Sequence, residues 1–346
     1  MTRRILTASL GLAPLTIAIH FLAHLGSTVD FVLAALSLIP LAWLIGEATE
    51  HAAHHTGSGV GGFLNATFGN APELIIALFA VSNGLFEVVR GSLTGSVVGN
   101  LLLVLGFSLL FGGRGALDRA SSFLSVGLVG VAAALFLITA VPGWDGDPER
   151  SSLAQLSVIP SAVLLVVYLG VTWYSLRRHR LMHVADEPSE MRAWSLRTSL
   201  LVLGAATVAT ALIAEILVGS IDQFAESVRL SDFFVAAVIV AIVGNAAEHG
   251  GAVVVAARGK IKLATEIALA SSAQVAVFLI PAVVLLSWLI DPLALSFRQV
   301  EIAVLFGSTA VTAILLADGR SSRPKGVLLI VTYAAAATAF LVAGDR

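Results

Sequence analysis

Long apolar stretches dominate this chain, and each is about as long as a helix must be to cross a hydrocarbon layer of roughly 30 Å. Hydrophobic residues make up 58% of the 346 residues and charged residues only 12%, whereas a soluble domain carries about 25% charged residues. We therefore predict an all-α integral membrane protein with eleven transmembrane helices. The predicted spans lie near residues 5–24, 29–50, 62–82, 91–111, 122–141, 157–176, 198–219, 232–257, 262–290, 298–317 and 325–343.

The connections between the spans indicate how the chain is divided. The longest polar connection, residues 178–197, separates six spans from five and is predicted to be a cytoplasmic linker. The first apolar run has no convincing cleavage site after it, so we interpret it as a retained helix and not as a signal peptide. We expect a first transmembrane helix in 1–26, one repeat in 29–177 (spans two to six) and a second repeat in 198–345 (spans seven to eleven).

Basic residues predict the orientation of these spans. With the N-terminus inside, fifteen lysine and arginine residues fall on the inner side and five on the outer side, and such an excess marks the cytoplasmic side. We expect a cytoplasmic N-terminus, an external C-terminus and a location in the inner membrane of a prokaryotic cell. The net charge of -2 and the lack of a basic stripe give no indication of nucleic acid as a partner, and without cysteine the chain has no thiolate metal site.

Two similar polar strings interrupt the apolar stretches, one in each half of the chain: Gly69-Asn70-Ala71-Pro72-Glu73 and Gly244-Asn245-Ala246-Ala247-Glu248. An ionisable residue at membrane depth is costly and usually marks an ion or substrate path. If the first span stands apart, the remaining ten form two groups of five, and an odd number of spans gives the groups opposite orientations. Transporters built from such inverted repeats bind their substrate near the middle of the membrane, where the halves meet.

The residue types in the two strings suit a hard divalent cation. Asn70 and Glu73, like Asn245 and Glu248, are three positions apart and share one helix face. Pro72 has no backbone N–H and therefore frees the carbonyl oxygen of Phe68. Four further oxygen-bearing residues come from spans four and nine: Ser96, Ser271, Ser272 and Gln274.

Six to eight flexible oxygen ligands favour Ca²⁺ over Mg²⁺. If Ca²⁺ leaves, burial and mutual repulsion favour protonation of the two carboxylates, so Ca²⁺ and protons should compete for Glu73 and Glu248. The structural alternative is that each Asn and Glu only forms hydrogen bonds between helices.

At these residues the chain resembles the calcium/proton exchanger branch of the calcium/cation antiporter superfamily. The matching stretches are residues 44–50, 61–74, 91–96 with 99–100, 213–215, 243–249, 271–274 and 317–319. The resemblance implies a peripheral first helix followed by two inverted five-helix repeats. It also implies a transporter, not an enzyme, that needs no cofactor and exchanges Ca²⁺ for H⁺ by alternating access, with Glu73 and Glu248 as the ligands and Asn70 and Asn245 assisting them.

The same resemblance places the second and seventh spans in the gates, and thus Glu47, Glu50 and Glu215 along the proton or cation path. For these three carboxylates the alternative is ordinary solvation near the ends of the spans. His249 either tunes the proton affinity of its neighbour Glu248 or only packs in the protein. The sequence does not choose between these roles.

Two other functions are compatible with parts of the sequence. A sodium/calcium exchanger of the same superfamily is the nearer alternative, although that branch carries repeats richer in serine and threonine. A membrane di-iron desaturase is the remote one, because histidines recur at short spacing: His51/His54/His55, His20/His24 and His179/His183. The predicted topology puts His20 and His24 on the outer side and the other histidines on the inner side, too far apart for one metal centre. His51, His54 and His55 could also bind a metal or sense pH by themselves, or be solvated loop residues.

Overall fold

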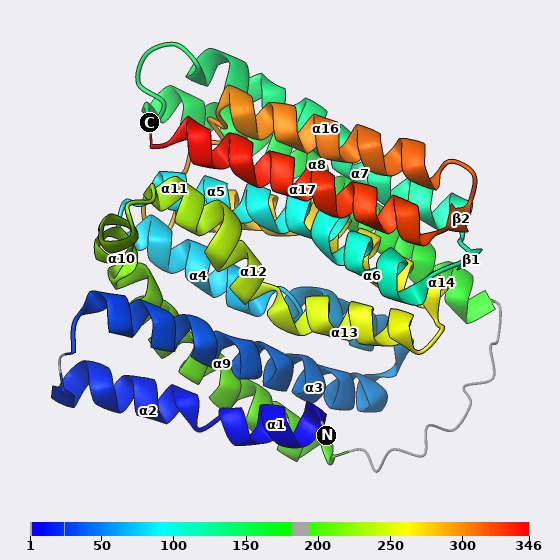
Figure 1. Cartoon of the computed structure of the whole chain (residues 1–346), viewed down its shortest axis with the longest axis horizontal. Helices are drawn as coiled ribbons and strands as arrows, with labels where there is room; N and C mark the ends of the chain where they lie inside the picture. The colour runs from blue at the N-terminus through cyan, green and yellow to red at the C-terminus, as the bar shows by residue number, and fades with distance from the viewer. Residues whose placement is uncertain (1, 24, 182–193, 346) are drawn as a thin grey trace.

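The computed structural model describes residues 2–23, 25–181 and 194–345 and is almost entirely helical. The long helices run side by side, and the N- and C-termini lie at opposite ends of the bundle (Figure 1). In the described ranges, nine helices are long and apolar enough to cross a membrane, or ten if the bent pair Ile221–Val228 and Asp232–Gly244 is one span. We call the end that holds the N-terminus the N-face and the opposite end the C-face.

The first half of the chain forms a first span, which consists of three short elements, and five further helical regions. Its elements are α1 (Thr2–Ser9), α2 (Leu12–Ala18), η1 (Ile19–Ala23), α3 (Ser27–Phe68), α4 (Ala71–Ser82), α5 (Phe86–Val98), η2 (Gly99–Val104), α6 (Leu105–Gly112), β1 (Gly115–Ala116), α7 (Arg119–Gly143) and α8 (Ser151–Leu181), where η denotes a π-helix.

The second half repeats this pattern of long and interrupted helices. Its elements are α9 (Leu196–Gly219), α10 (Ile221–Val228), α11 (Asp232–Phe234), η3 (Val235–Val240), α12 (Ala241–Gly244), α13 (Ala246–Ala257), α14 (Ile261–Gln274), η4 (Val275–Leu279), α15 (Ile280–Ser287), α16 (Gln299–Leu316), β2 (Arg320–Ser321) and α17 (Arg323–Ala343). The short strands β1 and β2 pair antiparallel and join two loops at the N-face.

The spans differ strongly in how much of their surface the protein covers. Of the most apolar window in each span, 83% is buried in 86–112 but only 11% in 4–23. The first span is therefore at the edge of the bundle, and the α5–η2–α6 span is at its centre. Polar side chains on the central span consequently face other helices and not lipid.

The gap that we expect between the spans near 29–50 and 62–82 is helical in the structure. Helix α3 continues through the expected gap and has 42 residues. Each glycine in this region costs a helix only about 1 kcal/mol, whereas helical backbone keeps every N–H and C=O bonded where water is scarce. The chain instead leaves the helix at Gly69 and Asn70, directly before Pro72, which occupies the first turn of α4.

The second half has an equivalent interruption inside the span predicted near 232–257. Helix α12 ends at Gly244, and α13 begins at Ala246. The helix that leads to this break crosses α5 very closely, because a Cβ atom placed on Gly95 would lie 1.9 Å from the carbonyl oxygen of Ala237. Only a glycine allows the two backbones to approach so closely.

Candidate cation site at the two helix breaks

The two polar strings of the sequence form the two helix breaks. Asn70 is the N-cap residue of α4 and Asn245 that of α13, with nearly the same backbone angles (φ -99°, ψ 13° and φ -93°, ψ 4°). Glu73 and Glu248 each lie in the first turn of the helix that follows. The exposed N–H groups of a helix N-terminus stabilise negative charge, so each break provides a favourable place for a carboxylate.

The two breaks meet inside the protein. A Cβ atom on Gly244 would lie 3.3 Å from Cγ and 3.7 Å from Oε1 of Glu73, so the carboxyl group of the first break packs against the backbone of the second. The Glu73 side chain is buried, and its charge interacts with that of Glu248. The prediction that the two halves contribute to one polar centre therefore agrees with the geometry around Gly244.

Polar residues of two central spans, α5–η2–α6 in the first half and α14–η4–α15 in the second, hold the asparagines across the interface between the halves. Asn245 Nδ2 donates to Ser96 Oγ at 2.9 Å, and Asn70 Nδ2 lies 3.5 Å from Gln274 Oε1. Each asparagine thus directs its amide N–H group to a residue on the central span of the opposite half. This leaves the amide oxygen of Asn245, which is buried and has no hydrogen-bond partner within the described structure.

Glu248 is held by a short polar chain. Ser271 Oγ donates to Glu248 Oε2 at 2.5 Å and accepts from Asn100 Nδ2 at 3.1 Å. Ser272 does not point to the carboxylates in the same way, because its hydroxyl donates to the carbonyl of Val97 at 3.0 Å. Ser271 is therefore the serine of span nine that contacts an acidic residue, and Ser272 joins the two central spans.

Two positions in this centre were not predicted as site residues, Asn100 and Gly244. The sequence contained a signal for both, because Gly-Asn pairs occur at 69–70, 99–100 and 244–245. The pair at 99–100 lies where α5 changes into the π-helix η2. Segments of π-helix occur often at functional sites, where they rotate side chains out of the regular helical pattern.

The free oxygens of the centre fit a hard cation. Glu73 Oε2 and Asn245 Oδ1 are both buried without a hydrogen-bond donor among the described residues. A buried acceptor without a partner costs free energy, and a cation bound between Glu73, Glu248 and Asn245 would remove that cost. These ligand atoms are all oxygen, which is the preference of Ca²⁺ and not of zinc or copper.

A cavity of about 480 Å³ leads from the N-face half of α3 to this centre. It is lined by Glu47 and Glu50 on α3, by the break residues Gly69 and Gly244, and by Glu248. The two α3 carboxylates predicted for the path therefore do share a cavity with a predicted ligand. The cavity thus extends from the two helix breaks along α3 as far as Ala53, toward the N-face.

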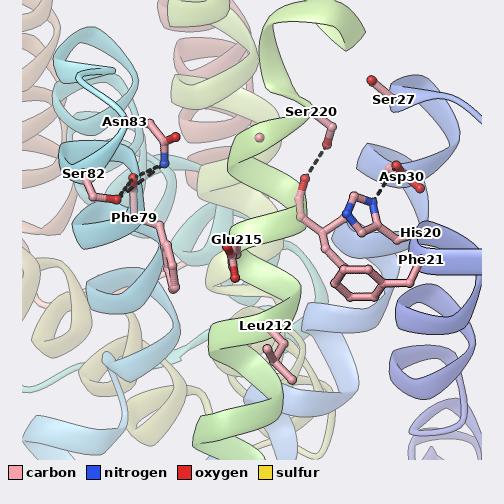
Figure 2. Close-up of a pocket in the computed structure, with 12 residues that line it drawn as sticks. His20, Phe21, Ser27, Asp30, Phe79, Ser82, Asn83, Leu212, Glu215 and Ser220 are labelled. Carbon is pink, nitrogen blue, oxygen red and sulfur yellow. Dashed lines mark hydrogen bonds and ion pairs between the residues drawn. The ribbon is translucent and has the colours of Figure 1, made fainter. Parts of the chain in front are cut away.

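The third carboxylate predicted for the path, Glu215, lies elsewhere. It lines a separate cavity of about 510 Å³ that α9 forms with α4, α3 and the first span near the C-face (Figure 2). Glu47 and Glu215 occupy matching places in the two halves, within Leu-Ile-Gly-Glu (44–47) and Leu-Ile-Ala-Glu (212–215). Each half of the chain thus provides one helix glutamate to a cavity, and the two cavities lie toward opposite faces.

The remaining predicted residues have less specific surroundings. Phe68 ends α3 and packs with Ile45, Ala71 and Leu203. His249 is partly buried, and its Nε2 atom has no hydrogen-bond partner in the described part of the chain.

The histidines of α3 lie near the N-face. His51 stacks on Trp194 with 4.5 Å between ring centroids, and its Nε2 atom is 3.7 Å from Glu47 Oε1. His55 Nε2 lies 2.7 Å from the carbonyl oxygen of Trp194. His20 pairs with Asp30 in the first turn of α3, whereas His51 and His55 lie more than twenty residues further along the same helix. His24 and His183, together with the side chain of His179, fall outside what the structure describes.

Comparison with known proteins identifies the family. The sodium/calcium exchanger protein family matches residues 26–177 and 198–342. The chain belongs to this family. A relative of this exchanger, the Ca²⁺/H⁺ antiporter of Synechocystis sp., is 37% identical over 94% of both chains. The vacuolar calcium ion transporter of Schizosaccharomyces pombe is 38% identical, over 90% of this chain and 78% of its own.

Solved structures agree with this assignment. The structure of native YfkE matches this exchanger with a TM-score of 0.83 and 33% identity, and covers 98% of this chain and 99% of its own. A crystal structure of an H⁺/Ca²⁺ exchanger, CAX, matches with a TM-score of 0.74 at 13% identity, covering 99% and 92% of the two chains, and thus supports the fold alone. The predicted resemblance to the calcium/proton branch is confirmed.

Proposed function

We propose that this protein is a secondary active antiporter that exchanges Ca²⁺ for H⁺ across a membrane by alternating access. The observation that carries the proposal is the meeting of Glu73 with Gly244, which joins the two helix breaks in one buried centre with unpaired acceptor oxygens. The relatives named Ca²⁺/H⁺ antiporter and vacuolar calcium ion transporter support the choice of ions.

Coupling follows from the charge of the centre. Two carboxylates in a poorly solvated place repel each other, and the repulsion is removed either by a divalent cation or by protons. The protein can therefore change its conformation with Ca²⁺ bound or with protons bound, but the empty, doubly negative centre is disfavoured. Each half-cycle then carries one kind of ion, which is the requirement for antiport.

The two cavities give the alternating conformations a structural basis. The N-face cavity reaches Glu248, whereas the C-face cavity that contains Glu215 shares no lining residue with it. We assign the present structure to a state in which the centre is accessible from the N-face. In the opposite state, movement of α3 and α9 would connect the C-face cavity to the same centre.

We further propose how the chain is arranged in the membrane. Helix α3 has more residues than one crossing requires, so its last part together with α4 supplies a further crossing, and the total is eleven. Residues 29–177 and 198–345 form the inverted repeats around the peripheral first helix. The excess of basic residues places the N-face in the cytoplasm and the C-face outside, in the inner membrane of a prokaryotic cell.

Ion flux in proteoliposomes tests the function. A pH gradient with the acidic side inside should drive Ca²⁺ uptake into vesicles that contain the purified protein. A Na⁺ gradient at constant pH should not do so. Ca²⁺ movement that follows the Na⁺ gradient and ignores pH would instead identify a sodium/calcium exchanger.

A further inference from the structure

The C-face cavity contains a histidine that the exchange centre does not use. His20 comes from the first span, which precedes the residues that match the family. Its Nδ1 atom lies 2.9 Å from Oδ2 of Asp30, near the start of α3. Figure 2 shows this pair on one side of α9 and the Phe79, Ser82 and Asn83 group of α4 on the other, with Glu215 between them.

The pair holds a buried carboxylate at the edge of the cavity. The side chain of Asp30 is 11% exposed and that of His20 is 37% exposed. The second oxygen of Asp30, Oδ1, is buried and has no hydrogen-bond partner in the described ranges. His20 is thus the side chain that positions and can neutralise Asp30.

The charge of the cavity depends on this histidine. Its titratable lining residues are His20 on the first span, Asp30 on α3 and Glu215 on α9, while α4 contributes the neutral Ser82 and Asn83. The adjacent helix α10 presents a neutral group to α3, because Ser27 donates to Gln223; its acidic residues Asp222 and Glu226 are not among the residues that line the cavity. A positive charge at residue 20 would make this lining less negative by one charge.

We propose that His20 is a proton-sensitive positioning residue that controls how strongly the C-face cavity attracts Ca²⁺. Histidine changes its charge between pH 5 and 8. In acid at the C-face, protonated His20 pairs with Asp30, and the weaker negative field allows released Ca²⁺ to leave. At higher pH the positive charge that pairs with Asp30 is lost. The two carboxylates of α3 and α9 then raise the local concentration of divalent cations.

The inference rests on the proposed exchange function and concerns the side from which protons enter. The peripheral first span thereby acquires a role that neither repeat supplies, because it sets the charge at one mouth of the path. It acts through Asp30 and does not itself contact the ion at Glu73 and Glu248.

Two substitutions of His20, one neutral and one positively charged, test the inference. The measurement is the apparent Ca²⁺ affinity for uptake from the C-face in oriented proteoliposomes, with the N-face pH fixed and the C-face pH varied from 6 to 8. His20→Gln should keep the high affinity of the cavity with an uncharged residue 20, and at pH 6 it should bind Ca²⁺ about fivefold more tightly than the wild type. His20→Lys should keep the low affinity, and at pH 8 it should bind about fivefold more weakly than the wild type.

Matched variants separate this effect from general damage. His54→Gln removes an exposed histidine at the other end of α3 and should follow the wild type at every pH. If a His20 variant is not monodisperse, Asp30→Asn provides the same test, because it removes the charge that His20 neutralises and should keep the low affinity at pH 8. Wild-type pH dependence in the His20 variants or in Asp30→Asn would overturn the inference, whereas a wild type that moves no Ca²⁺ in a pH gradient would refute the exchange function itself.

Discussion

The side chain of Glu73 lies directly against Gly244, although the two residues belong to different halves of the chain. A methyl group on Gly244 would be 3.3 Å from Cγ of Glu73. The glycine of one break therefore determines where the carboxylate of the other break lies. This contact makes the two breaks one centre.

The contact predicts a specific defect for Gly244→Ala. The added Cβ has to displace the Glu73 side chain by a few tenths of an ångström, and a shift of this size in a ligand weakens binding. We expect an apparent Ca²⁺ affinity about three- to tenfold lower, with little change in expression or thermal stability. Gly250→Ala is the control, because a Cβ at that position meets no atom within 4 Å. An unchanged affinity in Gly244→Ala would mean that Glu73 is not constrained from this side.

The two carboxylates should be equally necessary for exchange. Glu73→Gln and Glu248→Gln keep the shape of the side chain but remove the charge that Ca²⁺ and protons share. Each variant should lose at least about 100-fold of the proton-driven Ca²⁺ flux while remaining monodisperse in detergent. Glu266→Gln, which changes a partly exposed glutamate near Lys262, should transport normally. Normal flux in either centre variant would remove that residue from the binding site.

The close crossing at Gly95 predicts a loss of stability and not of affinity alone. A Cβ at residue 95 would be 1.9 Å from the carbonyl oxygen of Ala237, so Gly95→Ala must separate α5 from η3. Overpacking of this kind costs about 1–3 kcal/mol or more. The melting temperature in detergent should fall clearly, whereas Gly127→Ala on α7, where a Cβ meets no atom within 4 Å, should melt like the wild type. Equal melting of both variants would show that the two backbones can separate freely.

A buried charge cluster near the C-face should be a second determinant of stability. Arg90 is 1% exposed and donates to Glu149 Oε1 at 2.6 Å and to the carbonyl of Ala294 at 3.2 Å. Its charge also interacts with buried Glu301, which accepts from Thr94. Removal of one partner from a buried cluster leaves an uncompensated charge and costs about 3–5 kcal/mol.

Arg90→Met should therefore lower the melting temperature in detergent far more than Arg258→Met, which removes an exposed arginine of the N-face. Arg90→Met should also reduce the yield of folded protein from membranes. If both methionine variants melt at the same temperature, the cluster does not stabilise the fold.

The sequence predicted the chemistry of the centre better than the helices around it. Asn70 and Glu73 could be placed on one face because their spacing of three residues fits a helix turn, and both do lie at the start of α4. The breaks at Gly69 and at Asn245 could not be located in the same way. Apolar stretches measure how much of a chain can lie in a membrane, and they do not reveal where the backbone hydrogen bonds are interrupted.

The sequence also could not predict which side chains contact each other across the two halves. Ser271 and Ser272 are neighbours with the same side chain, yet one contacts Glu248 and the other the Val97 carbonyl. Likewise, Glu47 and Glu215 occur in similar strings but line different cavities. Their surroundings depend on helix rotation and packing, which a periodic pattern does not fix.

Proton release upon Ca²⁺ binding to purified protein tests most directly whether the two ions compete for one pair of carboxylates. Calcium is added to weakly buffered protein in detergent near neutral pH, and the released protons are followed with a pH indicator. The account predicts release that saturates together with Ca²⁺ binding in the wild type and is absent when Glu73 and Glu248 are both replaced by glutamine. Ca²⁺ binding at full affinity without proton release in the wild type, or unchanged release in the double variant, would contradict it.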